Sequence, residues 1–262
     1  INGGTFKGTS GTFTVAGPWT NTGTFTHNGS NVDFDGGSAQ TITSGGSPFS
    51  SVSISNTAAT VSNADAFTFS NGATLTIDAS ATFATAGFAF TTNGGSITNN
   101  GTFQMNGDEV TTAALSIPGN TKFVDTSGAT LTSTLNGLED VIFDASGQTF
   151  VFGESMTYIT GDITVASGTT VNMATHNLTI ADSKTITNNG TWTAPSSPST
   201  LTCAGDATFA GDNMNFYNFS AQVANKTLTF ADTKTYTVAN DLTLTGADGT
   251  ELELNTTGGA TA

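Results

Sequence analysis

The stretch KTLTFADTKTYTVANDLTLTG, from Lys226 to Gly246, decides the fold class. Apolar and polar residues alternate along it, and a period of 2 is typical of a β-strand with one buried and one wet face. Its strands are short, because Asp, Asn and Gly interrupt the alternation where a chain can turn. The residues predicted to point inward are Leu228, Phe230, Tyr236, Val238, Leu242 and Leu244.

The rest of the 262-residue chain has the same character. Thr is the commonest residue and Gly, Ala, Ser and Asn follow, whereas Leu, Glu and Lys are scarce and Arg is absent. This composition disfavours helices and favours strands. With 36% hydrophobic residues and nineteen Phe, the chain has too much apolar surface to stay disordered. The sequence therefore predicts an ordered all-β protein.

The charge excludes two classes of partner. All five basic residues are Lys, and twenty carboxylates set a formal net charge of -15. Nucleic-acid binding requires clustered Lys and Arg, so we expect no nucleic-acid partner. The same charge opposes docking on an anionic membrane, and no window approaches the roughly 18 to 20 apolar residues of a membrane span, so we expect no membrane insertion.

A short motif recurs along the chain. ITNNGT occurs at Ile97–Thr102 and again at Ile186–Thr191, and a looser copy, WTNTGTF, begins at Trp19. Aligning the three sites predicts three repeat units of roughly 80 to 90 residues, at 19–96, 97–185 and 186–262. Residues 1–18 resemble the tail of a preceding unit. The Asn and Gly of the motif are residues that tight turns require.

Two architectures fit units of this size. One is a row of tandem β-sandwich domains, and the other is a parallel β-helix, or β-solenoid, with several coils of some twenty residues in each unit. Separate sandwiches should be joined by linkers, yet the chain has only five Pro and its composition does not shift near 97 or 186. Short echoes such as GTF at Gly11 and Gly23 recur inside the units. Both observations favour one continuous solenoid.

Two longer stretches carry a resemblance to a known family. GGSAQTITSGGSPFSSVSIS at Gly36 and NMNFYNFSAQVANKTLTFADTKTYTVANDLTLTG at Asn213 resemble the repeats of filamentous-haemagglutinin-like and adhesin-like bacterial surface proteins. The resemblance covers nearly the whole chain and rests on patterning. It implies a right-handed parallel β-helix, located outside the cell or on its surface, that serves as a stalk, adhesin or filament and carries no catalytic residues.

Evidence for an enzyme is weak in the residues themselves. Polysaccharide-degrading β-helix enzymes place Arg or Lys beside clustered carboxylates, and no such arrangement occurs in this sequence. Only His27 and His176 could act as bases near neutral pH. No nucleophile motif accompanies either residue, and we interpret both as turn histidines. The sequence thus predicts a protein without catalytic activity.

Metal and cofactor sites are not predicted either. Asp33 and Asp35 share one strand face, which could hold Ca²⁺ or an acid–base pair, and Glu139, Asp140 and Asp144 form a second acidic group. We interpret both groups as solvated outer faces. The sequence has no Cys/His zinc spacing and no glycine-rich Ca²⁺ repeat.

Three residues remain as candidates for burial or contact. The lone Cys203 rules out an internal disulfide and is predicted to be a core residue. Trp19 and Trp192 occupy alternate positions of near-equivalent strands and could contact a ligand such as a surface glycan, although core stacking fits the same pattern. Paired Thr residues such as Thr243 and Thr245 suggest ice binding as a distant alternative, because Thr is also a common residue on a wet strand face.

These features predict a structural extracellular protein. A solenoid exposes unpaired strand edges at its terminal coils unless they are capped, and neither INGGTFKG nor ELELNTTGGATA resembles a cap. The expected partner is the chain itself, in a head-to-tail homopolymer, or flanking repeats of a longer chain. The alternative is an adhesin or carbohydrate-binding module, and a polysaccharide-degrading enzyme is a distant one.

Overall fold

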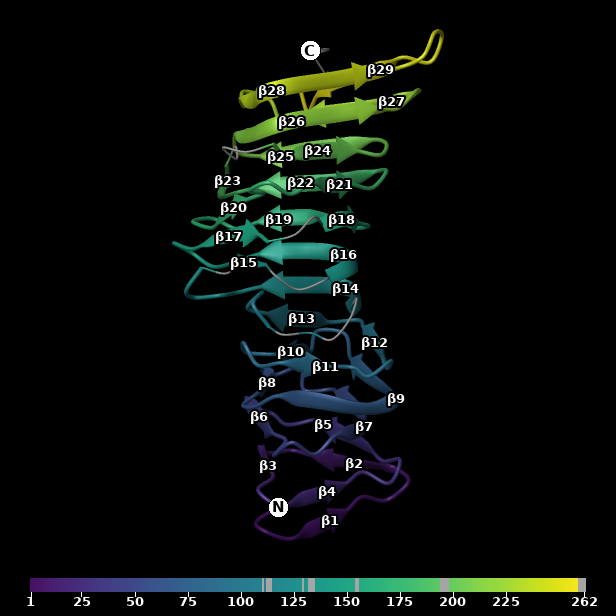
Figure 1. The fold of residues 1–262 in the computed structure, drawn as a ribbon, viewed down its shortest axis with the longest axis vertical. Coiled ribbons are helices and arrows are strands. Elements are labelled where there is room, and N and C mark those ends of the chain that lie inside the picture. The colour runs from purple at the N-terminus through teal and green to yellow at the C-terminus, as the bar shows by residue number, and fades with distance from the viewer. Residues whose placement is uncertain are drawn as a thin grey trace. The chain divides into compact units, whose positions relative to one another are not determined.

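The computed structural model describes residues 1–109, 111, 115–128, 130–131, 135–153, 156–193 and 198–258. The regular elements in these ranges are β-strands (Figure 1). Among the same residues there is no helix long and apolar enough to cross a membrane. The chain forms two compact units, Ile1–Lys122 and Phe123–Ala262, which we call the N-terminal and C-terminal units.

The N-terminal unit is built from short strands. In chain order they are β1 (Thr5–Lys7), β2 (Thr12–Val15), β3 (Trp19–Thr20), β4 (Thr24–Thr26), β5 (Asn31–Phe34), β6 (Gln40–Thr43), β7 (Phe49–Ile54), β8 (Val61–Asn63), β9 (Phe67–Ile77), β10 (Thr82–Ala84), β11 (Phe90–Thr91), β12 (Ser96–Asn99), β13 (Thr102–Met105) and β14 (Leu115–Phe123). The last residue of β14 is the first of the C-terminal unit.

Strands of the N-terminal unit stack in three series, which are the three sides of a coil. One side is β2, β5, β7, β9 and β12, and another is β3, β6, β8, β10 and β13. The third contains β1 with β4, and β9 with β11. Every one of these pairings is parallel. Along the first side the register places Phe13, Val32, Val52, Leu75 and Ile97 in one inward column.

The C-terminal unit continues the same kind of strand. Its strands are β15 (Thr130–Leu131), β16 (Leu135–Phe143), β17 (Thr149–Phe152), β18 (Met156–Ile159), β19 (Ile163–Val165), β20 (Thr170–Asn172), β21 (Leu178–Ile180), β22 (Lys184–Asn188), β23 (Thr191–Thr193), β24 (Thr200–Cys203), β25 (Ala207–Gly211), β26 (Met214–Gln222), β27 (Lys226–Phe230), β28 (Tyr236–Thr245) and β29 (Leu252–Thr256).

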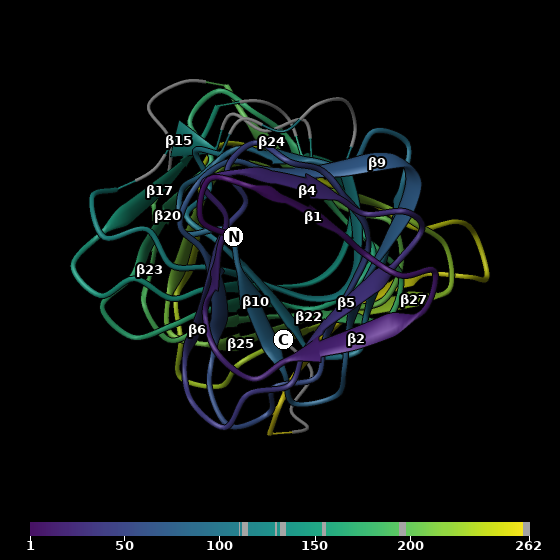
Figure 2. The ribbon, with the colours of Figure 1, turned by 90° about the horizontal axis from the view of Figure 1, so that it is seen from below.

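These strands also form three parallel series. The first runs through β16, β19, β22, β25, β27 and β29, the second through β17, β20, β23, β26 and β28, and the third through β18, β21, β24, β26 and β28. Figure 2 shows β17, β20 and β23 together on one side of the coil, and β22 and β25 together on another. Paired residues are 18 to 26 positions apart, from Thr200 with Asn218 to Lys226 with Leu252.

Inward columns fill each interior. On the first side of the C-terminal unit, Val141, Ile163, Ile186, Phe209 and Phe230 lie one above another. The first four are buried. The Thr residues next to them along each strand face outward, as the alternation predicts. Parallel pairing at coil-length separations confirms the parallel β-solenoid. It also excludes tandem β-sandwiches, whose strands pair antiparallel. The division into three repeat units stays a prediction.

Candidate functional site

The repeated Asn–x–Gly triplets form corners, the turns that join two sides of a coil. Asn99 is buried, and its Nδ2 donates a hydrogen bond of 2.9 Å to the carbonyl of Asn120, one coil further on. Its Oδ1 accepts a hydrogen bond of 3.2 Å from the N–H of Gly101. One side chain therefore satisfies main-chain groups on two coils that a turn would leave unpaired.

The other two copies of the motif repeat this geometry. Asn188 donates to the carbonyl of Asn213 at 2.8 Å and accepts from the N–H of Gly190 at 3.2 Å. Asn21 donates to the carbonyl of Ser44 at 2.8 Å and accepts from the N–H two residues later at 3.0 Å. ITNNGT and WTNTGTF are thus similar because each forms a corner with the same two hydrogen bonds. The motif serves the stacking of coils.

Glycine is required at these corners because neighbouring coils approach closely. A Cβ added to Gly190 would lie 2.2 Å from the carbonyl oxygen of Thr169 and 2.5 Å from that of Ala166. On the next coil, Gly211 has a φ of +83°, and its Cβ would lie 2.2 Å from the carbonyl oxygen of Asn188. Both positions are therefore closed to larger residues.

Trp19 and Trp192 lie in the interior. Trp19 is 8% exposed and packs edge-on against Phe25, with 5.0 Å between ring centroids. Trp192 is 1% exposed and lies in register between Val171 and Met214. Their burial fits the core-stacking alternative, and neither ring presents a face to solvent on which a sugar could stack.

The histidines and the first acidic group make local contacts. His27 and His176 are half-buried residues at turns, and the Nδ1 of His27 accepts a hydrogen bond from the main chain. Asp33 accepts a hydrogen bond of 2.6 Å from the hydroxyl of Ser55, while Asp35 lies beyond the end of β5. The contact of His27 lies within its own turn, and that of Asp33 joins it to the neighbouring coil.

In the second acidic group one carboxylate bonds to the next coil, and the cysteine lies in the interior. Asp140 accepts a hydrogen bond from the N–H of Asp162, one coil further on, at 2.8 Å. Glu139 is exposed and Asp144 is half-buried. In the described ranges no group of three or more His, Cys, Asp or Glu could hold a metal ion. Cys203 is buried as predicted, and burial raises the pKa of its thiol to about 12, which leaves it unreactive at neutral pH.

The sequence did not predict the burial of the Glu109 carboxylate. Glu109 is almost wholly buried and accepts main-chain hydrogen bonds from Asn106 at 2.6 Å and Gly107 at 2.7 Å. The hydroxyl of Thr85, on the preceding coil, also donates to it. The four residues therefore form a closed polar cluster that ties two coils together. Nothing in the local sequence distinguishes Glu109 from an exposed loop residue, because the hydroxyl of Thr85 reaches it only after the chain has folded.

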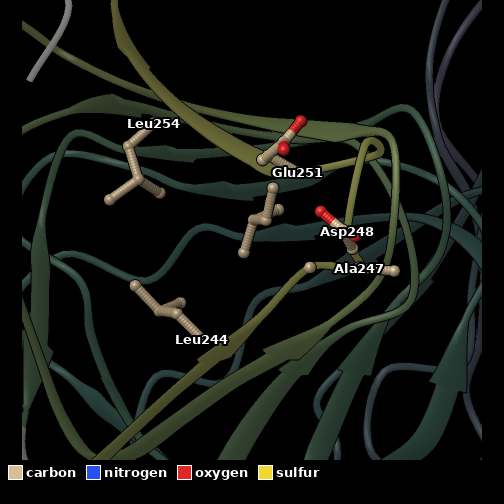
Figure 3. A pocket seen from close by; sticks show the side chains of 7 residues that line it. Leu244, Ala247, Asp248, Glu251 and Leu254 are labelled. Carbon is tan, nitrogen blue, oxygen red and sulfur yellow. The ribbon is translucent and has the colours of Figure 1, made fainter.

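Exposed apolar side chains concentrate at two edges of the solenoid coils. Leu242 is 56% exposed and Leu244 is 36% exposed on β28, and Phe6 is 41% exposed on β1. Beside β28 a hollow of about 410 Å³ is lined by Leu244, Leu254 and acidic residues, and it adjoins an apolar one of about 130 Å³. In Figure 3, Leu244 and Leu254 lie on one side of this hollow, with Asp248 and Glu251 across from them.

These edges are the candidate functional site. A strand edge with exposed inward-type side chains can accept another strand, because main-chain groups and an apolar column are both available. Comparison with family models, with curated proteins and with solved structures finds no match to this chain.

Proposed function

We propose that this chain is a structural, non-catalytic element of an extracellular or cell-surface protein, a stalk or filament that extends by the stacking of coils. The observation that carries the proposal is the exposed apolar edge of β28, where Leu242 and Leu244 continue columns that are buried in the preceding strands. A further coil on this edge would bury them at a gain of roughly 25 cal/mol per Å² of apolar surface.

The corners support the same proposal. The amides of Asn99 and Asn188 join one coil to the next, and Gly101 and Gly190 admit close approach. Stability in such an architecture is a sum over neighbouring coils, so length can grow without a new kind of contact. A spacer or filament needs this property, whereas a catalytic site does not.

A glycan-binding adhesin ranks below this function. Aromatic platforms for sugars need an exposed ring face, and the two Trp candidates are buried. Several carboxylates of the C-terminal unit accept hydrogen bonds between coils, as Asp140, Asp162 and Asp182 do.

The test is immunogold electron microscopy of intact source cells with an antibody raised against this chain. We expect gold particles outside the cell, along extended surface structures. Label confined to the cell interior, or bound to isolated compact particles, would contradict the proposed function.

A further inference from the structure

Asn–Gly steps are frequent in this chain, and such steps are chemically labile. The main-chain nitrogen of the glycine attacks the Cγ of the Asn: the N–Cγ bond forms, the Cγ–Nδ2 bond breaks, and the glycine proton leaves with ammonia. Water then opens the cyclic succinimide to Asp or isoaspartate. Glycine favours this reaction because it has no side chain to shield its nitrogen. The steps begin at Asn2, Asn28, Asn71, Asn93, Asn100, Asn106, Asn136 and Asn189.

At one corner the step Asn100–Gly101 is held on both sides. The N–H of Gly101 donates to the Oδ1 of Asn99 at 3.2 Å, and the N–H of Asn100 donates to the carbonyl of Ile77 at 2.9 Å. Ring closure requires rotation of the main chain at Asn100, so that the glycine nitrogen reaches the side-chain carbon. The two hydrogen bonds fix the peptide groups before and after Asn100 and oppose this rotation.

The equivalent corner holds Asn189–Gly190 in the same way. The N–H of Gly190 donates to the Oδ1 of Asn188 at 3.2 Å, and the N–H of Asn189 donates to the carbonyl of Val165 at 2.8 Å. Asn189 is nevertheless an exposed residue, as Asn100 is. Water and hydroxide therefore reach both Asn side chains, and any protection must come from the fixed main chain.

Close packing of the glycines acts in the same direction. A Cβ added to Gly101 would lie 2.3 Å from the carbonyl oxygen of Ala81 and 2.5 Å from that of Asp78. These distances resemble those at Gly190, where two carbonyl oxygens of the preceding coil also approach. The glycine of each corner thus has little space in which to turn.

The step Asn71–Gly72 has different surroundings. Both residues are exposed, and a Cβ added to Gly72 would meet nothing within 4 Å. The step lies in β9 where the register with β7 shifts, between the pairs made by Phe49 and Ser51. The regular ladder is interrupted at such a shift, and the main chain there opens at a lower free energy than at a packed corner.

We propose that Asn71 is a site of spontaneous deamidation in the folded chain, and that Asn99 and Asn188 protect the neighbouring steps Asn100–Gly101 and Asn189–Gly190 from the same reaction. The buried Asn of a corner then has a chemical role besides joining two coils. It keeps the glycine nitrogen bound and away from the adjacent side chain.

The positions differ in what the product does to the structure. An isoaspartate inserts an extra carbon into the main chain. At Gly101 this would push the corner against the carbonyls of Ala81 and Asp78, whereas the exposed irregular part of β9 has space for it. Either product at Asn71 adds a carboxyl group, which is ionised at neutral pH.

The first experiment is peptide mass spectrometry of the intact 262-residue chain after incubation in mildly alkaline buffer. In the folded chain, Asn71 should deamidate at least about tenfold faster than Asn100 or Asn189. In urea the three rates should become similar, because denaturation removes the corner hydrogen bonds. Asn71→Gln should abolish the early mass change, since the longer Gln side chain closes its ring much more slowly.

The second experiment removes the protecting side chains one at a time. Asn99→Ala should accelerate deamidation of Asn100 by about tenfold or more and leave Asn189 unchanged. Asn188→Ala is the matched variant, and it should accelerate Asn189 alone. Each variant thus carries an untouched corner as its internal control, which separates local protection from loss of the whole fold.

Two results would overturn the inference. One is deamidation of Asn100 or Asn189 as fast as that of Asn71 in the folded wild-type chain. The other is equal acceleration of Asn100 and Asn189 in Asn99→Ala, which would show that the fold as a whole, and not the adjacent amide, protects these steps. The wild-type comparison decides the first point even where a variant fails to fold.

Discussion

The interior of the N-terminal unit differs from the middle of the C-terminal unit, between Ile159 and Cys203. In the N-terminal unit, ring contacts run without interruption from Phe6 to Phe103. In the C-terminal unit, the stretch from Ile159 to Cys203 is filled mainly by Ile, Val and Leu, and Trp192 is the one buried ring among the residues described there.

The number of residues in a coil does not depend on whether its interior is aromatic or aliphatic. Val52 and Leu75 are register partners in the aromatic unit, and Ile163 and Ile186 are partners in the aliphatic stretch, and both pairs are 23 positions apart. The corners are alike too, since Asn99 and Asn188 make the same two hydrogen bonds. Main-chain pairing and corners therefore set the coil, and the interior must only be apolar and of suitable volume.

The largest expected effect is in the aromatic interior. Phe67 is fully buried and stacks on Phe49 at 5.0 Å and on Phe90 at 5.9 Å. Phe67→Ala should lower the free energy of unfolding by about 3–5 kcal/mol, because it removes both stacks and leaves a cavity. The measurement is urea denaturation followed by circular dichroism.

The matched change in the aliphatic stretch is Ile186→Val, which deletes one methyl group from a fully buried side chain. It should cost about 0.5–1.5 kcal/mol. If Phe67→Ala costs no more than Ile186→Val, loss of a whole ring with its stacks costs no more than loss of one methyl group, and the comparison between the two interiors loses its energetic content.

The corners should respond alike in both units. Asn99→Ala and Asn188→Ala each remove a buried side chain that donates to one main-chain group and accepts from another, and each should cost about 1–3 kcal/mol. Asn100→Ala and Asn189→Ala change the neighbouring exposed residues and should stay within about 0.5 kcal/mol. Unequal costs for Asn99→Ala and Asn188→Ala in denaturation experiments would show that the interior does influence the corner.

Much of this architecture could be predicted from sequence. The alternation at Lys226–Gly246 predicts which side chains point inward, and the ITNNGT sites predict turns. The role of Asn99 could not be derived from its spacing, because its partner Asn120 belongs to the next coil and becomes a neighbour only through folding. Glu109 was missed for the same reason, since Thr85 approaches it from another coil.

The site was predicted only in outline. Open strand edges follow from the repeat pattern, but which side chains they expose depends on the coil on which each strand lies. Leu242 has the same alternating pattern as Leu228, yet Leu228 is buried and Leu242 is exposed. The two Trp candidates show the converse, since an aromatic beside a turn can belong to an inward column.

Charge is the second difference between the units. The N-terminal unit has six carboxylates and two Lys, and the C-terminal unit has fourteen and three. In the C-terminal unit, Asp carboxylates accept the N–H of a residue one coil on: Asp162 accepts from Thr185 at 2.8 Å and Asp182 accepts from Asp206 at 2.8 Å. These Asp carboxylates thus accept hydrogen bonds from the next coil, and Lys226 adds an ion pair to Asp182.

The smallest expected effect concerns that lysine. The Lys226 ammonium donates a hydrogen bond of 2.6 Å to Asp182, and together with the N–H of Asp206 it holds the pKa of the Asp182 carboxyl below its ordinary value of 3.8. A lowered folded-state pKa contributes stability above the ordinary Asp pKa and loses it as the pH falls through the folded-state pKa. Lys226→Met should therefore raise the Asp182 pKa and make stability less dependent on pH below about pH 4.

Carboxyl ¹³C shifts followed by NMR through an acid titration measure this pKa directly. Lys234→Met is the control, because Lys234 pairs with Asp212 at 2.8 Å and should leave Asp182 unchanged. Since Asp182 and Lys226 are both on the surface, salt should weaken the effect of Lys226→Met. An Asp182 pKa that stays low in Lys226→Met would mean that the main-chain N–H of Asp206 suffices to lower it.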